Sequence, residues 1–575
     1  MSRLTVQRLA GPLSAALLVA VASVCLPEAP AAATRPAERA RHVMVVGPEP
    51  LAVEEGLKVL REGGNAVDAA VTMGFVMAVT YPQAGNLGGG GFMLVQPPGG
   101  PPWFLDHRET APAGATRDMF LDRDGNVVDG RSLRGHMASG VPGTVAGLAL
   151  ALEKGGTIPL RRAVSPAVRL AREGFVVPRG LAEALSNARD LLAPHEQVRL
   201  IFFKDGEPLE AGMRLVQPDL ARTLSAIAEG GPRAFYEGTI AEAVAADMAA
   251  HGGLITRKDL AAYRPALRTP LEGTYRGLRV VSSPPPSSGG VALLQTLQML
   301  EPFALRPLGH NSSAYVHTVS EALKRAFADR SLWLGDPDFV NVPVQALVSS
   351  AYTSRRMAGF RPDRATPADQ AGPGRPVGAE GSSTTQVSIV DAGGMAVSYT
   401  TTLNELFGSG VVPRGTGFLL NSEMDDFSIK PGVPNLYGLV GAEANSIAPG
   451  KRMLSSMTPT IVTTPEGQVI LVLGSPGGPA IISAVLQVLL NYVDFGMELQ
   501  AAVSAPRFHH QWLPDRIELD EGDFPADVLD ALKARGHGVH ERAPRCEVQT
   551  IRVDRASGWI YGAADPRRYG VARGY

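Results

Sequence analysis

Residues 380–404 read Glu380-Gly-Ser-Ser-Thr-Thr-Gln-Val-Ser-Ile-Val-Asp-Ala-Gly-Gly-Met-Ala-Val-Ser-Tyr-Thr-Thr-Thr-Leu-Asn404. Apolar residues alternate with smaller or polar ones on both sides of the turn sequence 391–394, which predicts a β-hairpin. A three-residue loop, 392–394, would pair Thr384 with Thr402, whereas a two-residue loop would shift this pairing by one position. The alternative is a threonine-rich surface hairpin, because threonine favours strands.

Thr384 stands at the start of this hairpin, after a run of small residues in which the chain could be cut. A threonine hydroxyl is a poor nucleophile unless a base lies beside it. If the bond between Ser383 and Thr384 is broken, the freed α-amine supplies that base on the same residue. Its reference pKa lies near ~8, so much of it is neutral at working pH. The segment therefore predicts acyl chemistry without a Ser-His-Asp triad.

A second turn stands further along the chain. Residues 469–473 predict a buried strand and residues 480–489 a helix, with Gly474-Ser-Pro-Gly-Gly478 between them. Such a turn presents backbone N–H groups at a helix N-terminus, where a developing oxyanion is stabilised. A phosphate loop or a close-packed turn is the alternative, but the run lacks the Gly-Lys-Ser/Thr ending of nucleotide P-loops.

Other segments alternate between helix and strand patterns. Val53, Leu57 and Leu60 have helical spacing, with Gly63-Gly64 as a stop. Further helices are predicted from Asn65, with Asp68 as the first-turn acid, and over 182–192 and 317–334. Strands dominate around 386–404 and 459–473, and the Gly- and Pro-rich run 371–383 predicts a linker that ends at Thr384. This mixture indicates layered α/β packing.

Composition limits the possible functions. Of the 575 residues, 45% are hydrophobic and 19% charged, so a sizeable core is expected. The formal net charge of −2 argues against nucleic-acid binding, which needs a concentrated basic face.

The N-terminus predicts export. Arg3 and Arg8 precede an apolar stretch, 13–26, and small residues up to Ala33, which together predict a signal peptide over 1–33 and a periplasmic or secreted bacterial protein. A single membrane anchor is the alternative, but the run is short for one, and no stable anchor is expected. Cys546 would be the only cysteine left in the mature chain, so no internal disulfide is expected.

Five motifs in order carry a resemblance to a known family. They are Pro82-Gln-Ala-Gly-Asn-Leu-Gly-Gly-Gly-Gly-Phe-Met93, Asp106-His-Arg-Glu-Thr-Ala-Pro112, Asn421-Ser-Glu-Met-Asp-Asp-Phe-Ser428, Leu454-Ser-Ser-Met-Thr-Pro-Thr460 and Gly474-Ser-Pro-Gly-Gly478. With them the chain, from about Val43 to Tyr575, resembles the γ-glutamyltransferases (glutathione hydrolases), a family of N-terminal-nucleophile (Ntn) hydrolases.

The resemblance implies a precursor that cuts itself before Thr384. The expected parts are a signal peptide (1–33), a large subunit (34–383) and a small subunit (384–575), which stay together in a four-layer αββα sandwich. The implied activity is transfer of the γ-glutamyl group of glutathione to water or to an amino-acid or peptide acceptor, through a γ-glutamyl-threonine intermediate. No metal or organic cofactor is expected.

The resemblance also implies a role for each site residue. Thr384 would be the nucleophile, Thr402 would assist its amine, and the amides of Gly477 and Gly478 would form the oxyanion hole. Positions implied to hold the α-amino end of the γ-glutamyl group are Asn404, Glu423 and Asp426, those implied to hold its α-carboxylate are Arg108, Ser455 and Ser456, and Tyr437 is implied at the tip of a lid loop.

These residue types suit the chemistry, since arginine grips a carboxylate with a bidentate fork and an aspartate pairs with an ammonium. Judged by local sequence alone, other roles remain open for the same residues. Asp425-Asp426 could begin a helix, Arg108-Glu109 could be a surface ion pair, Ser455-Ser456 could be a turn, and Tyr437 could lie in a plain exposed loop.

Two further features and two rival functions complete the expectations. Gln386 stands where the family commonly has histidine, which leaves its effect on self-cleavage open. His509-His510 are expected to be structural, because adjacent histidines point in different directions on a regular element. The rival functions are an acylase of the same fold, acting on cephalosporin-type side chains, and an uncleaved chain that only binds γ-glutamyl peptides.

Overall fold

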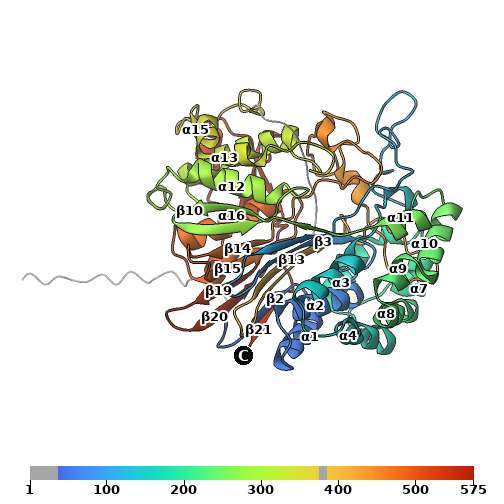
Figure 1. Ribbon diagram of the computed structural model, residues 1–575. Coiled ribbons are helices and arrows are strands. Elements are labelled where there is room, and N and C mark those ends of the chain that lie inside the picture. Colours follow the sequence, from blue (N-terminus) through green and yellow to red (C-terminus); the bar gives the residue numbers. More distant parts are fainter. Residues whose placement is uncertain (1–35, 375–384) are drawn as a thin grey trace, which may run out of the picture. The chain divides into compact units, whose positions relative to one another are not determined.

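The computed structural model describes residues 36–374 and 385–575, which belong to one compact unit (Figure 1). The predicted signal peptide and the predicted cleavage site at Ser383 and Thr384 lie outside the described residues.

Two seven-stranded sheets form the centre of the fold. The first, called the hairpin sheet, has the order β21 (Val571–Gly574), β2 (Met44–Gly47), β12 (Thr385–Val390), β13 (Ala396–Thr402), β3 (Gly90–Gln96), β4 (Trp103–Asp106) and β9 (Ala266–Arg268). The second sheet has the order β1 (Glu38–Ala40), β20 (Trp559–Ala564), β19 (Gln549–Asp554), β15 (Val469–Gly474), β14 (Thr460–Thr463), β11 (Leu278–Ser282) and β10 (Leu271–Tyr275).

Helices cover the outer face of each sheet (Figure 1). Against the hairpin sheet lie α1 (Pro50–Arg61), α2 (Ala66–Thr80), α3 (Thr144–Gly155), α4 (Leu160–Glu173) and α8 (Pro218–Gly230). Against the second sheet lie α12 (Gly289–Leu300), α13 (Ser313–Trp333) and α16 (Ala480–Val493). A third apolar cluster, which includes Met44, Phe92, Val472 and Ile551, fills the space between the sheets. The layers are therefore helices, sheet, sheet and helices, as predicted.

Shorter elements complete the described chain. The helices are α5 (Arg179–Asn187), α6 (Arg189–Leu192), α7 (Glu196–Phe202), α9 (Pro232–Tyr236), α10 (Thr239–Ala250), α11 (Arg257–Ala262), α14 (Val344–Leu347), α15 (Ser350–Met357), α17 (Leu499–Ser504) and α18 (Ala526–Ala534). The strands are β5 (Phe175–Val176), β6 (Phe203–Lys204), β7 (Glu207–Pro208), β8 (Arg214–Leu215), β16 (Phe508–His509), β17 (Ile517–Asp520) and β18 (Val539–Arg542). None of the helices in the described residues is both long and apolar enough to cross a membrane.

The hairpin has the register of the three-residue loop. Its described pairs run from Val390 opposite Ala396 to Thr385 opposite Thr401. In the turn, the Gly394 amide donates to the carbonyl of Asp391 at 3.0 Å, and Gly394 has a φ of +86°, which glycine adopts without strain. Thr385, the residue directly after Thr384, is thus paired in the predicted register.

The predicted helix boundaries are confirmed at α2 and corrected at two other places. Asn65 and Asp68 form a reciprocal capping box, because each side chain accepts a hydrogen bond from the other's backbone amide. α13 begins at Ser313, four residues before the predicted start, with Ser312 as its cap. The predicted helix over 182–192 is divided into α5 and α6, because Ala188 has a ψ of 10° and interrupts the helical geometry.

Candidate active site

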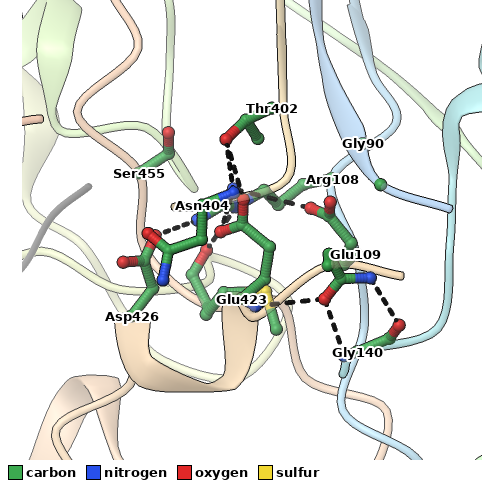
Figure 2. Close-up of polar contacts among 12 residues, drawn as sticks. Gly90, Arg108, Glu109, Gly140, Thr402, Asn404, Glu423, Asp426 and Ser455 are labelled. Atoms are coloured by element: carbon green, nitrogen blue, oxygen red, sulfur yellow. Dashed lines mark hydrogen bonds and ion pairs between the residues drawn. The ribbon is translucent and has the colours of Figure 1, made fainter. Parts of the chain in front are cut away.

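A fully buried ion cluster lies beside the end of β13 (Figure 2). Arg108, two residues after β4, directs Nη1 to Glu423 Oε2 at 2.6 Å and to Glu109 Oε2 at 3.5 Å, and its Nη2 donates to Asp426. Glu423 and Asp426 lie at the ends of one 3-10 turn, Glu423–Asp426. These four residues, called the carboxylate cluster, combine one cation with three acids. Arg108 and Glu109 are therefore not a surface ion pair, and Asp426 does not simply begin a helix, as the local sequence alone allowed.

Burial shifts the pKa values of two of these acids, Glu109 and Glu423, upward. The pKa of Glu109 is raised well above its usual value by burial and by the charge of Glu423. Burial also raises the pKa of Glu423, although Arg108 and a hydrogen bond from Thr402 oppose this shift. A low-dielectric site with more acids than cations favours an added positive charge, either a proton or a ligand ammonium group.

Thr402 and Asn404 connect the hairpin to this cluster. Thr402 Oγ1 donates to Glu423 Oε1 at 2.9 Å and accepts from the Asn404 amide at 2.8 Å. Asn404 has a φ of +73°, a left-handed conformation that asparagine tolerates better than most residues. Its amide group donates to the carbonyl of Ser422 and accepts from the Tyr437 hydroxyl at 3.2 Å. Tyr437, predicted at a lid tip, therefore contacts the site.

The two predicted carboxylate-binding serines face different partners. Ser455 follows Leu454, whose carbonyl accepts from Arg108 Nη2 at 3.5 Å, and its own hydroxyl oxygen accepts from the Met457 amide at 3.1 Å. Ser456 Oγ instead accepts from Arg330 Nη2 at 3.1 Å. Arg330, a buried residue of α13, was not singled out from the sequence, because nothing in its local pattern distinguishes it from other helical arginines.

Gly477 and Gly478 form the predicted turn between β15 and α16. Their φ angles are +130° and +62°, and a β-carbon on Gly477 would come within 2.4 Å of Cys546 Sγ. Within the described chain, no acceptor is recorded for either amide. A turn whose positive φ angles favour glycine, and whose two amides have no acceptor among the described residues, is suited to hold an oxyanion.

A cleft of about 240 Å³ brings several of these residues together. Its lining includes Thr402, Asn404, Tyr437 and Gly477, together with the arginines Arg542 and Arg545. The carboxylate cluster lies buried next to Thr402, not on the cleft surface. The predicted nucleophile, Thr384, and its neighbour Ser383 lie outside the described residues.

Gln386, on β12, forms hydrogen bonds within the hairpin sheet and packs against the second sheet. Its Oε1 accepts from Thr400 Oγ1 at 2.9 Å, and its Nε2 donates to Ser398 Oγ at 2.9 Å. A β-carbon on Gly474 would come within 2.3 Å of Gln386 Oε1, so the amide packs directly on the end of β15. Gln386 therefore fixes the hairpin against the strand that leads into the Gly477 turn.

The adjacent histidines have separate partners. His509 Nδ1 lies 2.7 Å from Ser483 Oγ, and His510 lies 3.3 Å from Asp515. Two groups of potential metal ligands occur among the described residues, namely His136, Asp247 and His251, and His317, Glu321 and His537. Neither group contains a residue of the predicted site.

Known proteins resemble this chain over most of its length. The family model described as Gamma-glutamyltranspeptidase matches residues 52–575. The glutathione hydrolase proenzyme of Escherichia coli (strain K12) is 51% identical over 530 residues, which cover 92% of this chain and 91% of that protein. The glutathione hydrolase proenzyme of Pseudomonas sp. (strain A14) is 45% identical over 572 residues, with 98% and 99% covered.

A solved structure extends the likeness to the fold. The cephalosporin acylase from Bacillus halodurans has a TM-score of 0.84 and 28% identity, and the match covers 97% of this chain and 99% of that one. The predicted four-layer Ntn-hydrolase fold is thus confirmed. The chain belongs to the gamma-glutamyltranspeptidase family.

Proposed function

We propose that the protein is an exported γ-glutamyltransferase and glutathione hydrolase that matures by cutting itself before Thr384. It would transfer the γ-glutamyl group of glutathione and related amides to water or to an amino-acid or peptide acceptor. The observation that carries this proposal is the hydrogen bond from Thr402 to Glu423, which joins the hairpin that follows Thr384 to a buried cluster with excess negative charge.

Maturation would use the same hydroxyl as catalysis. Thr384 Oγ attacks the carbonyl carbon of Ser383, the acyl group moves from nitrogen to oxygen, and water hydrolyses the resulting ester. The products are a large subunit ending at Ser383 and a small subunit beginning at Thr384. The pairing of Thr385 with Thr401 supports this proposal, because a hairpin in this register would bring the residue before Thr385 toward Thr402.

In the mature enzyme, the Thr384 amine accepts the hydroxyl proton as the oxygen attacks the γ-carbonyl carbon. The amides of Gly477 and Gly478 stabilise the oxyanion. The amine of the substrate's scissile amide departs with the proton held by the Thr384 amine. It leaves a γ-glutamyl ester on Thr384, which water or an acceptor amine then cleaves. Thr402 orients the amino terminus and keeps it near the carbonyl.

The ammonium and carboxylate groups of the substrate would replace ion pairs that are now formed within the carboxylate cluster. Its ammonium would approach Glu423, Asp426 and the side-chain oxygen of Asn404, and its carboxylate would replace one of the acids now paired with Arg108. The hydroxyls of Ser455 and Ser456 would complete the carboxylate site. A zwitterion suits this cluster, because it brings both a cation and an anion.

A second candidate is an acylase, because the cephalosporin acylase from Bacillus halodurans shares the fold over nearly the whole chain. A substrate without an ammonium group would leave the buried acids of the cluster without their expected ligand, which costs affinity. Glutathione hydrolysed much faster than a glutaryl amide would favour the γ-glutamyl function. The reverse order would favour the acylase.

The deciding experiment is a denaturing gel of purified wild-type protein and of Thr384→Ala. Wild type should give two bands of about 37 and 20 kDa, at the mean residue mass of this chain, and Thr384→Ala should give one. Thr385→Ala is the matched control and should still be cleaved. An active wild-type protein that stays a single chain would refute the mechanism. A single chain that binds γ-glutamyl peptides without cleaving them would leave the uncleaved binding protein. N-terminal sequencing of exported protein would test the signal peptide.

A further inference from the structure

A second ion cluster, of opposite sign, contributes two arginines to the lining of the cleft. Glu518, on β17, accepts from Arg516 at 2.9 Å, from Arg542 at 3.0 Å and from Arg545. These residues, called the arginine cluster, place three guanidinium groups around one carboxylate. Since one acid cannot neutralise three cations, positive charge remains at this position.

Two members of the arginine cluster line the catalytic cleft. Arg542 and Arg545 belong to its wall, together with Arg568, which is paired with Glu547 at 3.1 Å. Burial raises the pKa of Glu547 to about 7, so this acid is only partly ionised near neutral pH. The buried Nε of Arg542 has no acceptor in the described chain. Arg542 and Arg545 therefore bring to the cleft lining more positive charge than their shared partner Glu518 can neutralise.

Arg545 also lies close to the turn proposed as the oxyanion hole. A β-carbon on Gly477 would meet Cys546 Sγ at 2.4 Å and the Arg545 carbonyl oxygen at 3.2 Å. The segment 545–546 thus packs directly on the turn proposed as the oxyanion hole. The carboxylate cluster contacts Thr402, another residue of the cleft lining. A substrate with its γ-glutamyl head toward Thr402 would direct its leaving group toward the arginines.

We propose that Arg542 and Arg545 form an anion subsite that binds a carboxylate on the leaving group or on the acceptor amine. The inference rests on the proposed function and adds the selectivity of the enzyme for its leaving group and acceptor. The preferred class is an amino acid or short peptide with a free carboxyl group, gripped by guanidinium donors. Glu518 is a positioning residue, since it holds the two guanidinium groups at the cleft wall.

The test compares two γ-glutamyl anilides that differ only in one carboxylate, γ-glutamyl-4-nitroanilide and γ-glutamyl-3-carboxy-4-nitroanilide. In wild type, kcat/KM should be higher for the carboxylated anilide. Arg545→Met, which keeps an apolar stem without charge, should reduce the ratio of the two kcat/KM values about tenfold, and Arg542→Gln should reduce it several-fold. Arg516→Gln is the matched control, because Arg516 also pairs with Glu518 but does not line the cleft.

The salt dependence of wild type provides a test that needs no variant. The preference for the carboxylated anilide should decline as ionic strength rises, because a partly exposed charge pair is screened. Cleavage of both anilides at a ratio that neither Arg545→Met nor salt changes would overturn the anion subsite and leave the proposed function intact. Cleavage of neither anilide by a processed wild-type enzyme would overturn both.

Discussion

The carboxylate cluster and the arginine cluster have opposite compositions, because one surrounds a cation with acids and the other surrounds an acid with cations. In the carboxylate cluster, Arg108 is surrounded by three acids and every member is fully buried. In the arginine cluster, Glu518 is surrounded by three arginines, of which Arg516 is 41% exposed and Arg542 35% exposed. One cluster would attract an ammonium group and the other a carboxylate.

The difference in burial decides how each cluster responds to protons. The acids Glu109 and Glu423 have raised pKa values because burial outweighs one cation. The pKa of Glu518 is lowered to about 2, since three guanidinium groups outweigh its own desolvation. The same residue types thus give a proton-binding site in one place and a permanent ion cluster in the other. Water access and charge count account for this contrast.

The largest effect is expected from removing the single cation of the carboxylate cluster. Arg108→Met leaves three buried acids without a counter-charge, and breaking such a pair costs about 3–5 kcal/mol of unfolding free energy. Urea unfolding would measure it, with a larger loss at pH 8 than at pH 6. Arg516→Met should cost less than about 1 kcal/mol, because its side chain is exposed and Glu518 keeps two partners. An equal loss of unfolding free energy in Arg108→Met and Arg516→Met would contradict the proposed difference between the buried and the exposed cluster.

A smaller effect is expected when an acid loses its charge but keeps its shape. Asp426→Asn should raise KM for a γ-glutamyl anilide about 10- to 100-fold, because a charged contact to an ammonium contributes roughly 1.5–3 kcal/mol. Asp425→Asn is the control, since Asp425 accepts from Ser132 Oγ at 2.7 Å and belongs to the cleft of a neighbouring loop. A KM for Asp426→Asn within threefold of wild type would refute its role.

The smallest effect is a pH dependence of stability with opposite signs in the two clusters. Glu518 has a lowered pKa, so its stabilising contribution is complete above about 4.5 and is lost as pH falls toward 2. Glu518→Gln should therefore destabilise the protein by about 2 kcal/mol at pH 7 and by less at pH 3. Urea unfolding at both pH values measures this difference.

Glu109 should show the reverse trend. Its pKa is raised in the folded state, so wild type gains stability as pH falls from 8 toward the unfolded value of 4.5. Glu109→Gln should flatten that part of the curve. A Glu109→Gln profile as steep as that of wild type would contradict the assignment of the bound proton to this cluster.

Short-range features could be predicted from the sequence because their partners are close in the chain. The hairpin followed from alternation and a Gly-Gly turn, and the capping box followed from Asn65 and Asp68. The glycine turn before α16 was also located correctly. The division of the helix at Ala188 was missed, since nothing in its composition distinguishes that residue from its neighbours.

Long-range charge pairs were harder to predict. Arg108 and Glu109 are adjacent, yet the nearer acid is Glu423, more than 300 residues away. The arginine cluster was not recognised at all. Two arginines within four residues, Arg542 and Arg545, are an ordinary surface pattern until the fold brings Glu518 and Gly477 next to them.

The sequence by itself determined the strand and helix periods, the turn glycines, the helix caps and the family. Each of these depends on contacts between residues a few positions apart, or on motifs that are preserved in order. Only the tertiary structure decided which charges are buried, which acids share a cation and which arginines face the cleft. The reason is physical: the energy of a charge depends on its distance from water and from other charges, and folding sets both distances.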